Sequence, residues 1–160
     1  MARSNSTAAV LAALLTAAAM QACMQAGHTY SSYKSMGNGG WLREDTVAID
    51  FGPMMHGGQY AEELGLRTDS RYPFMEIAVI VDQQARPSGF SRKDTVYASL
   101  TDSNGHVTGE GIRHHQYIFN MPAAQLAKGD TLHVDIRHNM RRSPLKGITD
   151  VGLTIKNTDL

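Results

Sequence analysis

The chain has 160 residues, of which 42% are hydrophobic and 19% charged, and this composition is typical of one folded domain rather than of a disordered segment. Its formal net charge of zero speaks against nucleic-acid binding, which needs a basic excess. The single cysteine, Cys23, excludes an internal disulfide and a multi-cysteine zinc site.

The first 22 residues have the pattern of an export signal. Arg3 supplies a positive charge, residues 8–19 form an apolar run, and Ala22 precedes Cys23. The apolar run is too short to cross a bilayer core of roughly 30 Å. We therefore expect a lipoprotein signal peptide over residues 1–22 and membrane attachment through lipid on Cys23. The alternatives are an ordinary secreted protein cut after Ala22 and a retained N-terminal helix.

The remainder is predicted to be a tether followed by a β-domain. Residues 23–40 are mostly small and polar, so we interpret them as the lipidated cysteine and a flexible tether. In the domain, residues 41–157, apolar side chains alternate with polar ones. This alternation is clearest in four segments: 47–51, 96–100, 132–136 and 151–155. Seven or eight short strands favour an all-β, antiparallel β-sandwich of immunoglobulin-like or jelly-roll order.

Other segments give local expectations. Residues 74–81 are almost continuously apolar and predict a central strand covered on both faces. Asn104-Gly105 predicts a hairpin turn. Residues 52–70 are expected to form a long loop with a solvated Glu62-Glu63 pair. Pro122 is expected to end a short strand and to precede one helical turn.

Charge is unevenly distributed along the chain. Residues 44–82 contain eight acidic residues and two arginines, whereas residues 113–146 contain six basic residues and two acidic ones. Either the two regions pair across the sandwich, or the basic region forms a face for an anionic partner or a membrane surface.

Two motifs resemble the gliding-motility lipoprotein GldH family of Bacteroidetes. One is Arg-Tyr-Pro-Phe-Met at residues 71–75, followed by an apolar strand, and the other is the run from Met140 to Leu153 that contains Arg-Arg-Ser-Pro-Leu-Lys-Gly. The pattern continues at Tyr33-Lys34, Trp41 and Asp94-Thr95-Val96. The resemblance covers residues 23–156 and implies a non-enzymatic, lipid-anchored envelope protein of the gliding machinery.

The resemblance also implies a location and a class of partner. We expect an outer-membrane lipoprotein that binds envelope proteins of a gliding or secretion complex. The segment after Cys23 lacks the acidic residues that commonly mark surface export in this phylum, which favours the periplasmic side. The alternatives are an envelope or type IX secretion assembly factor in a non-gliding species, and a glycan-binding β-sandwich.

Each functional hypothesis has its own candidate residues. Arg141, Arg142 and Lys146 place three cations in a loop that contains proline and glycine, so they are candidates for contact with a partner or for solvation alone. An aromatic platform for glycan would comprise Trp41, Tyr60 and Tyr117.

The sequence contains no pattern that indicates catalysis, a cofactor or a metal. His114 and His115 are adjacent, so on a strand they point to opposite faces. Asp102, Asn104 and Glu110 lack EF-hand spacing, and there is no Gly-x-Ser-x-Gly motif. We therefore expect a non-enzymatic protein that uses no cofactor.

Overall fold

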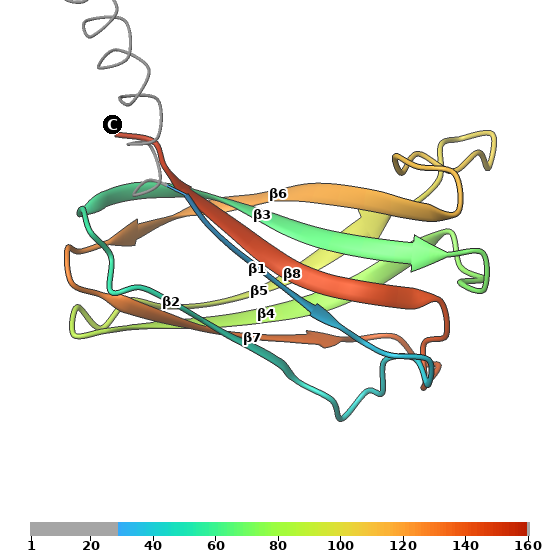
Figure 1. Ribbon diagram of the computed structural model, residues 1–160, viewed down its shortest axis with the longest axis horizontal. Helices are drawn as coiled ribbons and strands as arrows, with labels where there is room; N and C mark the ends of the chain where they lie inside the picture. The colour runs from blue at the N-terminus through green and yellow to red at the C-terminus, as the bar shows by residue number, and fades with distance from the viewer. Residues whose placement is uncertain (1–28, 160) are drawn as a thin grey trace, which may run out of the picture.

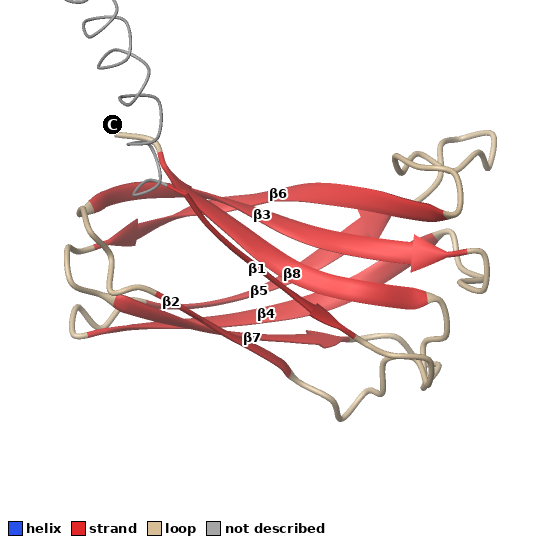
Figure 2. Cartoon of the chain, in the orientation of Figure 1, coloured by secondary structure: helices blue, strands red, loops and turns tan. Residues whose placement is uncertain are grey.

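The chain folds into two packed antiparallel sheets. The computed structural model describes residues 29–159; the expected signal peptide 1–22 and the lipidation site Cys23 lie outside the described residues. Figures 1 and 2 show the eight strands, which are β1 (Thr29–Ser35), β2 (Val47–Phe51), β3 (Gly58–Asp69), β4 (Glu76–Arg86), β5 (Ser91–Ser99), β6 (His114–Leu126), β7 (Thr131–His138) and β8 (Ile148–Asn157). The sheet orders are β1-β8-β3-β6 and β2-β7-β4-β5, which confirms the predicted β-sandwich. Within residues 29–159 there is no helix that could cross a bilayer.

The pairing order is that of a jelly roll. Strand β1 pairs with β8, β2 with β7, β3 with β6 and β4 with β5, as in one long hairpin that has been rolled up. The pairs β3–β8 and β4–β7 then complete the two sheets. Of the two strand orders left open by the sequence, the jelly roll is therefore the observed one.

The core lies between the two sheets and follows the predicted alternation. Strands β2, β7 and β8 each point every second side chain inward, and all these inward side chains are buried: Val47, Ile49, Phe51, Leu132, Val134, Ile136, Val151, Leu153 and Ile155. Removal of apolar surface from water stabilises the fold by roughly 25 cal/mol per Å². Strand β4 is a central strand between β7 and β5, as predicted, with Ile77, Val79 and Val81 buried on its inner face. The prediction that both faces are covered is wrong, because on the outer face Ile80 and Asp82 are partly exposed and Gln84 is exposed.

The expected flexible tether is shorter than predicted. Residues 29–35 form the edge strand β1, so the β-domain begins at Thr29 rather than at residue 41. The inner face of this strand has Tyr30, whose ring packs 6.5 Å from that of Phe51. Its outer face has Tyr33, and serines fill most of the other positions. This segment therefore lacks the apolar alternation by which a strand is predicted.

The prediction of a loop over residues 52–70 is wrong from Gly58 onward. Residues 58–69 form β3, which lies between β8 and β6. Glu62 occupies a core position and is 1% exposed, so it is buried rather than solvated. A carboxylate at an inward position interrupts the apolar alternation on which strand prediction depends.

Strand β6 also differs from its prediction. It continues through Pro122 to Leu126, so the expected helical turn is absent. Proline is tolerated here because β6 is an edge strand, and because the pairing shifts by one residue between Tyr60–Ala124 and Glu62–Met121. At Asn104-Gly105 the predicted hairpin turn is confirmed, with an antiparallel bridge between Thr101 and Val107.

Candidate functional site

One end of the sandwich gathers the loops that contain both family-like motifs. We call this the loop end; its four loops are 36–46, 70–75, 100–113 and 139–147. The described chain begins at Thr29 and finishes at Asp159 at the opposite end (Figure 1). The loop end therefore lies away from the point at which the N-terminal segment enters the domain.

The two motifs pack directly against each other at the loop end. The amide of Asp69 donates a hydrogen bond of 2.8 Å to the carbonyl of Gly147. Gly147 has φ +88°, and a Cβ at this position would collide with the backbone of Tyr72. A glycine is therefore required where the β7–β8 loop crosses the β3–β4 loop.

A second backbone contact fixes the β7–β8 loop. Trp41 and Leu145 exchange backbone hydrogen bonds of 3.0 and 2.8 Å, and both side chains are buried. The Trp41 ring packs edge-on at 5.2 Å from the ring of His138, whose pKa is lowered by burial. The apolar residues of this loop therefore have a structural role, and its charged residues project outward.

The outward charges form a basic pocket of ≈ 270 Å³. It is lined by Arg71, Arg142 and Lys146, together with Pro73, Phe74, Ser143 and Pro144. Arg71 is held by Asp69 at 2.6 Å, and this hydrogen-bonded pairing lowers the pKa of the Asp69 carboxyl. Arg142 and Lys146 are exposed and make no hydrogen bond or ion pair with any residue from 29 to 159. Arg141 is exposed as well but does not line the pocket.

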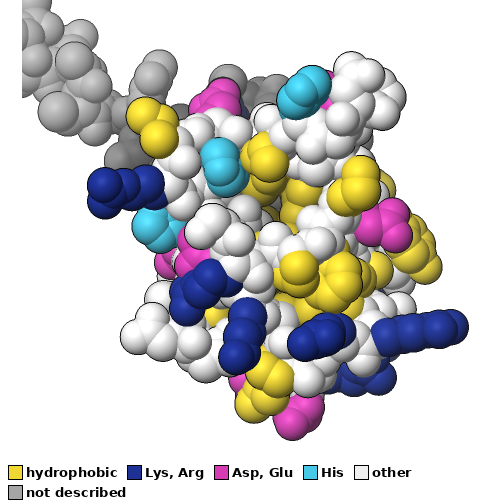
Figure 3. All heavy atoms as spheres, turned by 90° about the vertical axis from the view of Figure 1, so that its right-hand side faces the viewer, with side chains coloured by type: hydrophobic (Ala, Val, Ile, Leu, Met, Phe, Trp, Pro, Cys, Tyr) yellow, Lys and Arg dark blue, Asp and Glu magenta, His cyan; other side chains and the backbone are white. Residues whose placement is uncertain are grey.

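A hollow of ≈ 650 Å³ adjoins the basic pocket. We call it the apolar hollow for its four apolar side chains, although Glu76, Ser99, Thr101, Asp102 and Ser103 also line it. The two share Pro73 and Phe74, and the hollow continues over Met75 and Met140. Met75 is 58% exposed, although it was predicted to lie on the apolar face of a strand. Figure 3 shows the loop end from outside, with apolar side chains in the middle and lysines and arginines below them. Glu76 and Asp102 line the hollow but do not line the basic pocket.

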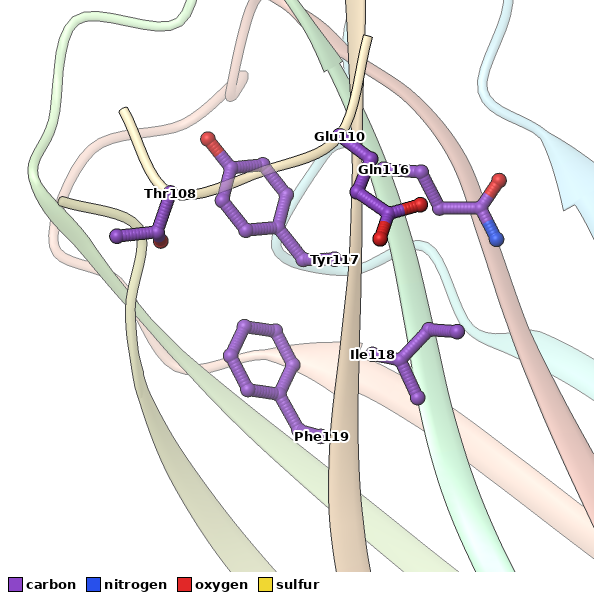
Figure 4. A pocket seen from close by; sticks show the side chains of 6 residues that line it. All are labelled: Thr108, Glu110, Gln116, Tyr117, Ile118 and Phe119. Carbon is purple, nitrogen blue, oxygen red and sulfur yellow. The ribbon is translucent and has the colours of Figure 1, made fainter. Parts of the chain in front are cut away.

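A third pocket of ≈ 280 Å³ lies beside the start of β6. Figure 4 shows Tyr117 and Phe119 on one face of the strand and Gln116 and Ile118 on the other. The Tyr117 and Phe119 rings are stacked, 6.2 Å apart and 6° from parallel. Gly109 lies against the Tyr117 ring, where a Cβ would come within 2.6 Å of Cζ, and the tyrosine is only 6% exposed.

The aromatic platform proposed for glycan binding does not form. Trp41 and Tyr60 are fully buried, and Tyr117 is covered as described above. The Tyr60 hydroxyl donates to the carbonyl of His56 at 2.8 Å, and its ring packs 6.4 Å from that of Tyr30. None of the three offers an exposed ring face on which a sugar could stack, because each fills space in the core.

Sequence reasoning missed a buried polar cluster between the sheets. Glu62 accepts hydrogen bonds from the Gln83 side chain at 2.9 Å and from the Arg92 guanidinium, which also donates to the carbonyl of Ala123 at 2.9 Å. Arg92 makes a second ion pair with Asp94 at 2.6 Å. Burial raises the pKa of Glu62, while the hydrogen bond from Gln83 and the charge of Arg92 oppose the shift. The sequence did contain a signal for this cluster, because Arg92 and Asp94 are in step with Val96 and so share the inward face of β5.

One histidine is held between two acidic residues. His133 lies on the outer face of β7, with Nδ1 at 2.7 Å from Asp50 and Nε2 at 3.3 Å from Asp135. The hydrogen bond to Asp50 raises the pKa of His133. Among residues 29–159, no three His, Cys, Asp or Glu side chains come together as a metal site.

These features define a jelly-roll domain whose distinctive surface is a basic, partly apolar loop end. Comparison with known proteins identifies the family. The family model described as GldH lipoprotein matches residues 28–155. The gliding motility lipoprotein GldH of Flavobacterium johnsoniae is 28% identical over 156 residues, which cover 91% of this chain and 95% of that protein. The chain therefore belongs to the GldH lipoprotein family and is a cell-envelope lipoprotein associated with gliding motility.

Solved structures resemble this chain only loosely. The CBM22-1–GH10 modules of Clostridium thermocellum xylanase 10B align with a TM-score of 0.41 at 11% identity, covering 83% of this chain but only 26% of that one. The Eiger TNF structure from S. frugiperda aligns with a TM-score of 0.32 at 11% identity, covering 83% of this chain and 95% of that one. Similarity at this level says nothing about what the chain binds.

Proposed function

We propose that this chain is a non-enzymatic docking subunit of the gliding machinery, anchored in the outer membrane by lipid on Cys23 and facing the periplasm. One observation carries the docking role: Arg142 and Lys146 stand unpaired among the described residues, beside an apolar hollow. Arginine, methionine and aromatic residues are the types enriched in protein interfaces, and Arg142, Met75 and Phe74 meet at this surface. The family match supports the anchor and the association with gliding.

The expected orientation of the domain relative to the membrane supports the same role. A lipid anchor holds the end at which Thr29 enters the sheet, and the loop end is at the other end of the strands (Figure 1). A docking surface in this position faces away from the anchoring bilayer. It is thus available to other envelope proteins while the lipid keeps the domain at the membrane.

Complementation in the source organism tests this proposal. A deletion strain receives the unaltered gene, an Arg142→Glu/Lys146→Glu variant or a Lys128→Glu/Arg137→Glu variant. The last pair is a matched control, since both residues are exposed cations outside the loop end. We expect gliding to be restored by the unaltered gene and the control and lost with the loop-end variant at equal membrane abundance. Equal gliding in all three strains would contradict a docking role for this end. If the organism does not glide, export by type IX secretion is the readout.

A further inference from the structure

We propose that the loop end binds an extended segment of a partner protein in which two or more carboxylates stand next to an apolar side chain. This inference rests on the proposed function in one respect, that the partner is a protein. It specifies the chemistry of the bound segment and its direction across the loop end. Both follow from how the basic pocket and the apolar hollow adjoin.

The basic pocket supplies the anionic half of the recognition. Arg142 and Lys146 are two free cations, and Arg71 adds a third whose side chain is still 50% exposed although Asp69 holds it. Asp69 fixes the Arg71 guanidinium with hydrogen bonds of 2.6 and 2.9 Å, so this donor is oriented before any partner arrives. A guanidinium forms paired hydrogen bonds to a carboxylate, and an ammonium adds a compact charge. One acidic residue against three cations leaves the pocket suited to more than one carboxylate.

The apolar hollow supplies the second half. Phe74 and Met140 are partly buried against the core, and Met75 is largely exposed. Methionine side chains adapt to irregular partners and are over-represented at binding surfaces that accept varied shapes. Aromatic residues, methionine and arginine are also the types enriched in interfaces. An apolar side chain of the partner would fill the hollow next to its own carboxylates.

The shape of the site favours an extended segment. The basic pocket and the hollow meet along Pro73 and Phe74, so the two features form one continuous surface. An extended segment can place one side chain in each feature, because its side chains on one side repeat about every 6.6 Å. The Trp41–Leu145 and Gly147–Tyr72 contacts hold the loops in place, so binding costs little ordering of this side of the interface.

The difference in charge between the two linings gives the segment a direction. Glu76 and Asp102 line only the hollow, whereas Arg142 and Lys146 line only the basic pocket. Carboxylates of the partner are repelled at the hollow and attracted at the basic pocket. The bound segment therefore has its acidic part over the β7–β8 loop and a neutral or basic part toward Asp102.

Site-directed photo-crosslinking of the full-length protein in intact cells tests this inference. A photoreactive amino acid replaces Arg141 beside the basic pocket, Ser103 at the hollow, or Lys128 at the opposite end as a control. The crosslinked peptides are sequenced by mass spectrometry. We expect Arg141 and Ser103 to capture one segment, with its acidic residues nearest position 141 and its apolar residue nearest position 103. Capture of lipid, of a second copy of this chain, of a neutral or basic segment, or of nothing at either position would overturn the inference.

A charge exchange completes the test. Arg142→Glu/Lys146→Glu is expected to reduce capture from position 103 at least tenfold, about the loss of one charge-assisted contact. Replacement of the captured carboxylates by lysine should restore capture to the variant, whereas Lys128→Glu/Arg137→Glu should leave it unchanged. Thermal midpoints of the variants show that the fold is intact. If capture is lost in the variant and is not restored by lysines in the partner segment, Arg142 and Lys146 do not pair directly with its carboxylates.

The outcomes separate the two proposals. If an acidic segment of a protein unrelated to gliding or secretion is captured, the inference stands and the proposed function fails. If gliding-machinery proteins are captured from Arg141 and Ser103 through a neutral or basic segment, the proposed function stands and the inference fails.

Discussion

At the scale of single residues, the least expected feature is a charged cluster inside a β-sandwich. Glu62 and Arg92 come from different sheets, and the guanidinium also satisfies the Ala123 carbonyl beside the irregularity in β6. An ion pair in this position is costly to desolvate, but removing one partner leaves the other charge buried. We interpret the cluster as a link between the sheets along the edge at which β5 and β6 face each other.

Glu62→Ala should therefore be strongly destabilising. We expect a loss of about 3 kcal/mol, since Arg92 would keep Asp94 but lose its buried partner. Urea unfolding of the purified protein measures the change. Glu63→Ala removes the adjacent, half-buried carboxylate as a control and should cost less than about 0.5 kcal/mol. Equal effects of the two substitutions would show that the cluster does not stabilise the fold.

His133 should respond measurably to the loss of Asp50. Its pKa is raised above 6.5 chiefly by the hydrogen bond to Asp50, so the charged form stabilises the fold. This contribution is complete below pH 6.5 and is lost as the pH rises through the raised pKa of the folded state. Titration by NMR should show a lower pKa for His133 in Asp50→Asn than in the unaltered protein. Asp135→Asn should cause a smaller shift, and the reverse order would contradict the assignment.

At the scale of elements, the edge strand β1 shows how glycine and tyrosine together set a register. Tyr33 lies over Gly65 of β3 and Gly152 of β8, and a Cβ on either glycine would collide with the ring. The Arg67 guanidinium lies over the same ring, 5.5 Å from its centroid. The pairing of Tyr33 with Gly152 fixes β1 against β8, although the strand has little apolar surface of its own.

Tyr33→Ala is expected to loosen β1. We expect about 1–2 kcal/mol of destabilisation from the lost ring contacts, together with faster amide exchange in β1. Tyr97→Ala makes the same chemical change at a tyrosine that is 79% exposed on the edge strand β5 and should have little effect. Hydrogen exchange and chemical unfolding of both variants measure the difference. Protection of β1 that survives in Tyr33→Ala would contradict this role.

The elements also show which parts of the fold could be predicted. Strands β2, β7 and β8 have a large apolar residue at every second position over residues 47–51, 132–136 and 151–155, and the pattern alone located them. Strands β1 and β3 were missed because their contacts involve residues distant in sequence. In β1 the Tyr33 ring lies against Gly65 and Gly152. In β3 the buried Glu62 pairs with Arg92. The cations at Arg142 and Lys146 were recognised as a candidate site, but their junction with Phe74 and Met75 arises only from the tertiary fold.

At the scale of the whole molecule, the topology separates the end that holds Thr29 and Asp159 from the loop end. Eight strands that alternate in direction return the chain to the end at which it started, so Thr29 and Asp159 lie together (Figure 1). The remaining end is free to combine four loops into one surface. This arrangement suits a lipoprotein that holds a partner away from its membrane.

Removal of the lipidation site should release the protein from the membrane. Cys23→Ala is expected to move the protein into the soluble periplasmic fraction, because a stable anchor requires the acyl chains. Gln25→Ala, two residues later, should leave it in the membrane fraction. Fractionation followed by immunoblotting measures both variants. An unchanged membrane fraction for Cys23→Ala would contradict anchoring through this residue.

The most direct test of the account as a whole is crosslinking in intact cells, followed by identification of the proteins that co-purify. A tag placed after residue 160 follows Asp159, at the end opposite the loop end, and so leaves the proposed docking surface open. The account predicts that subunits of the gliding or secretion machinery co-purify with the unaltered protein and with Lys128→Glu/Arg137→Glu, and are lost with Arg142→Glu/Lys146→Glu. Recovery of the same proteins with all three, or of the tagged protein alone, would contradict it.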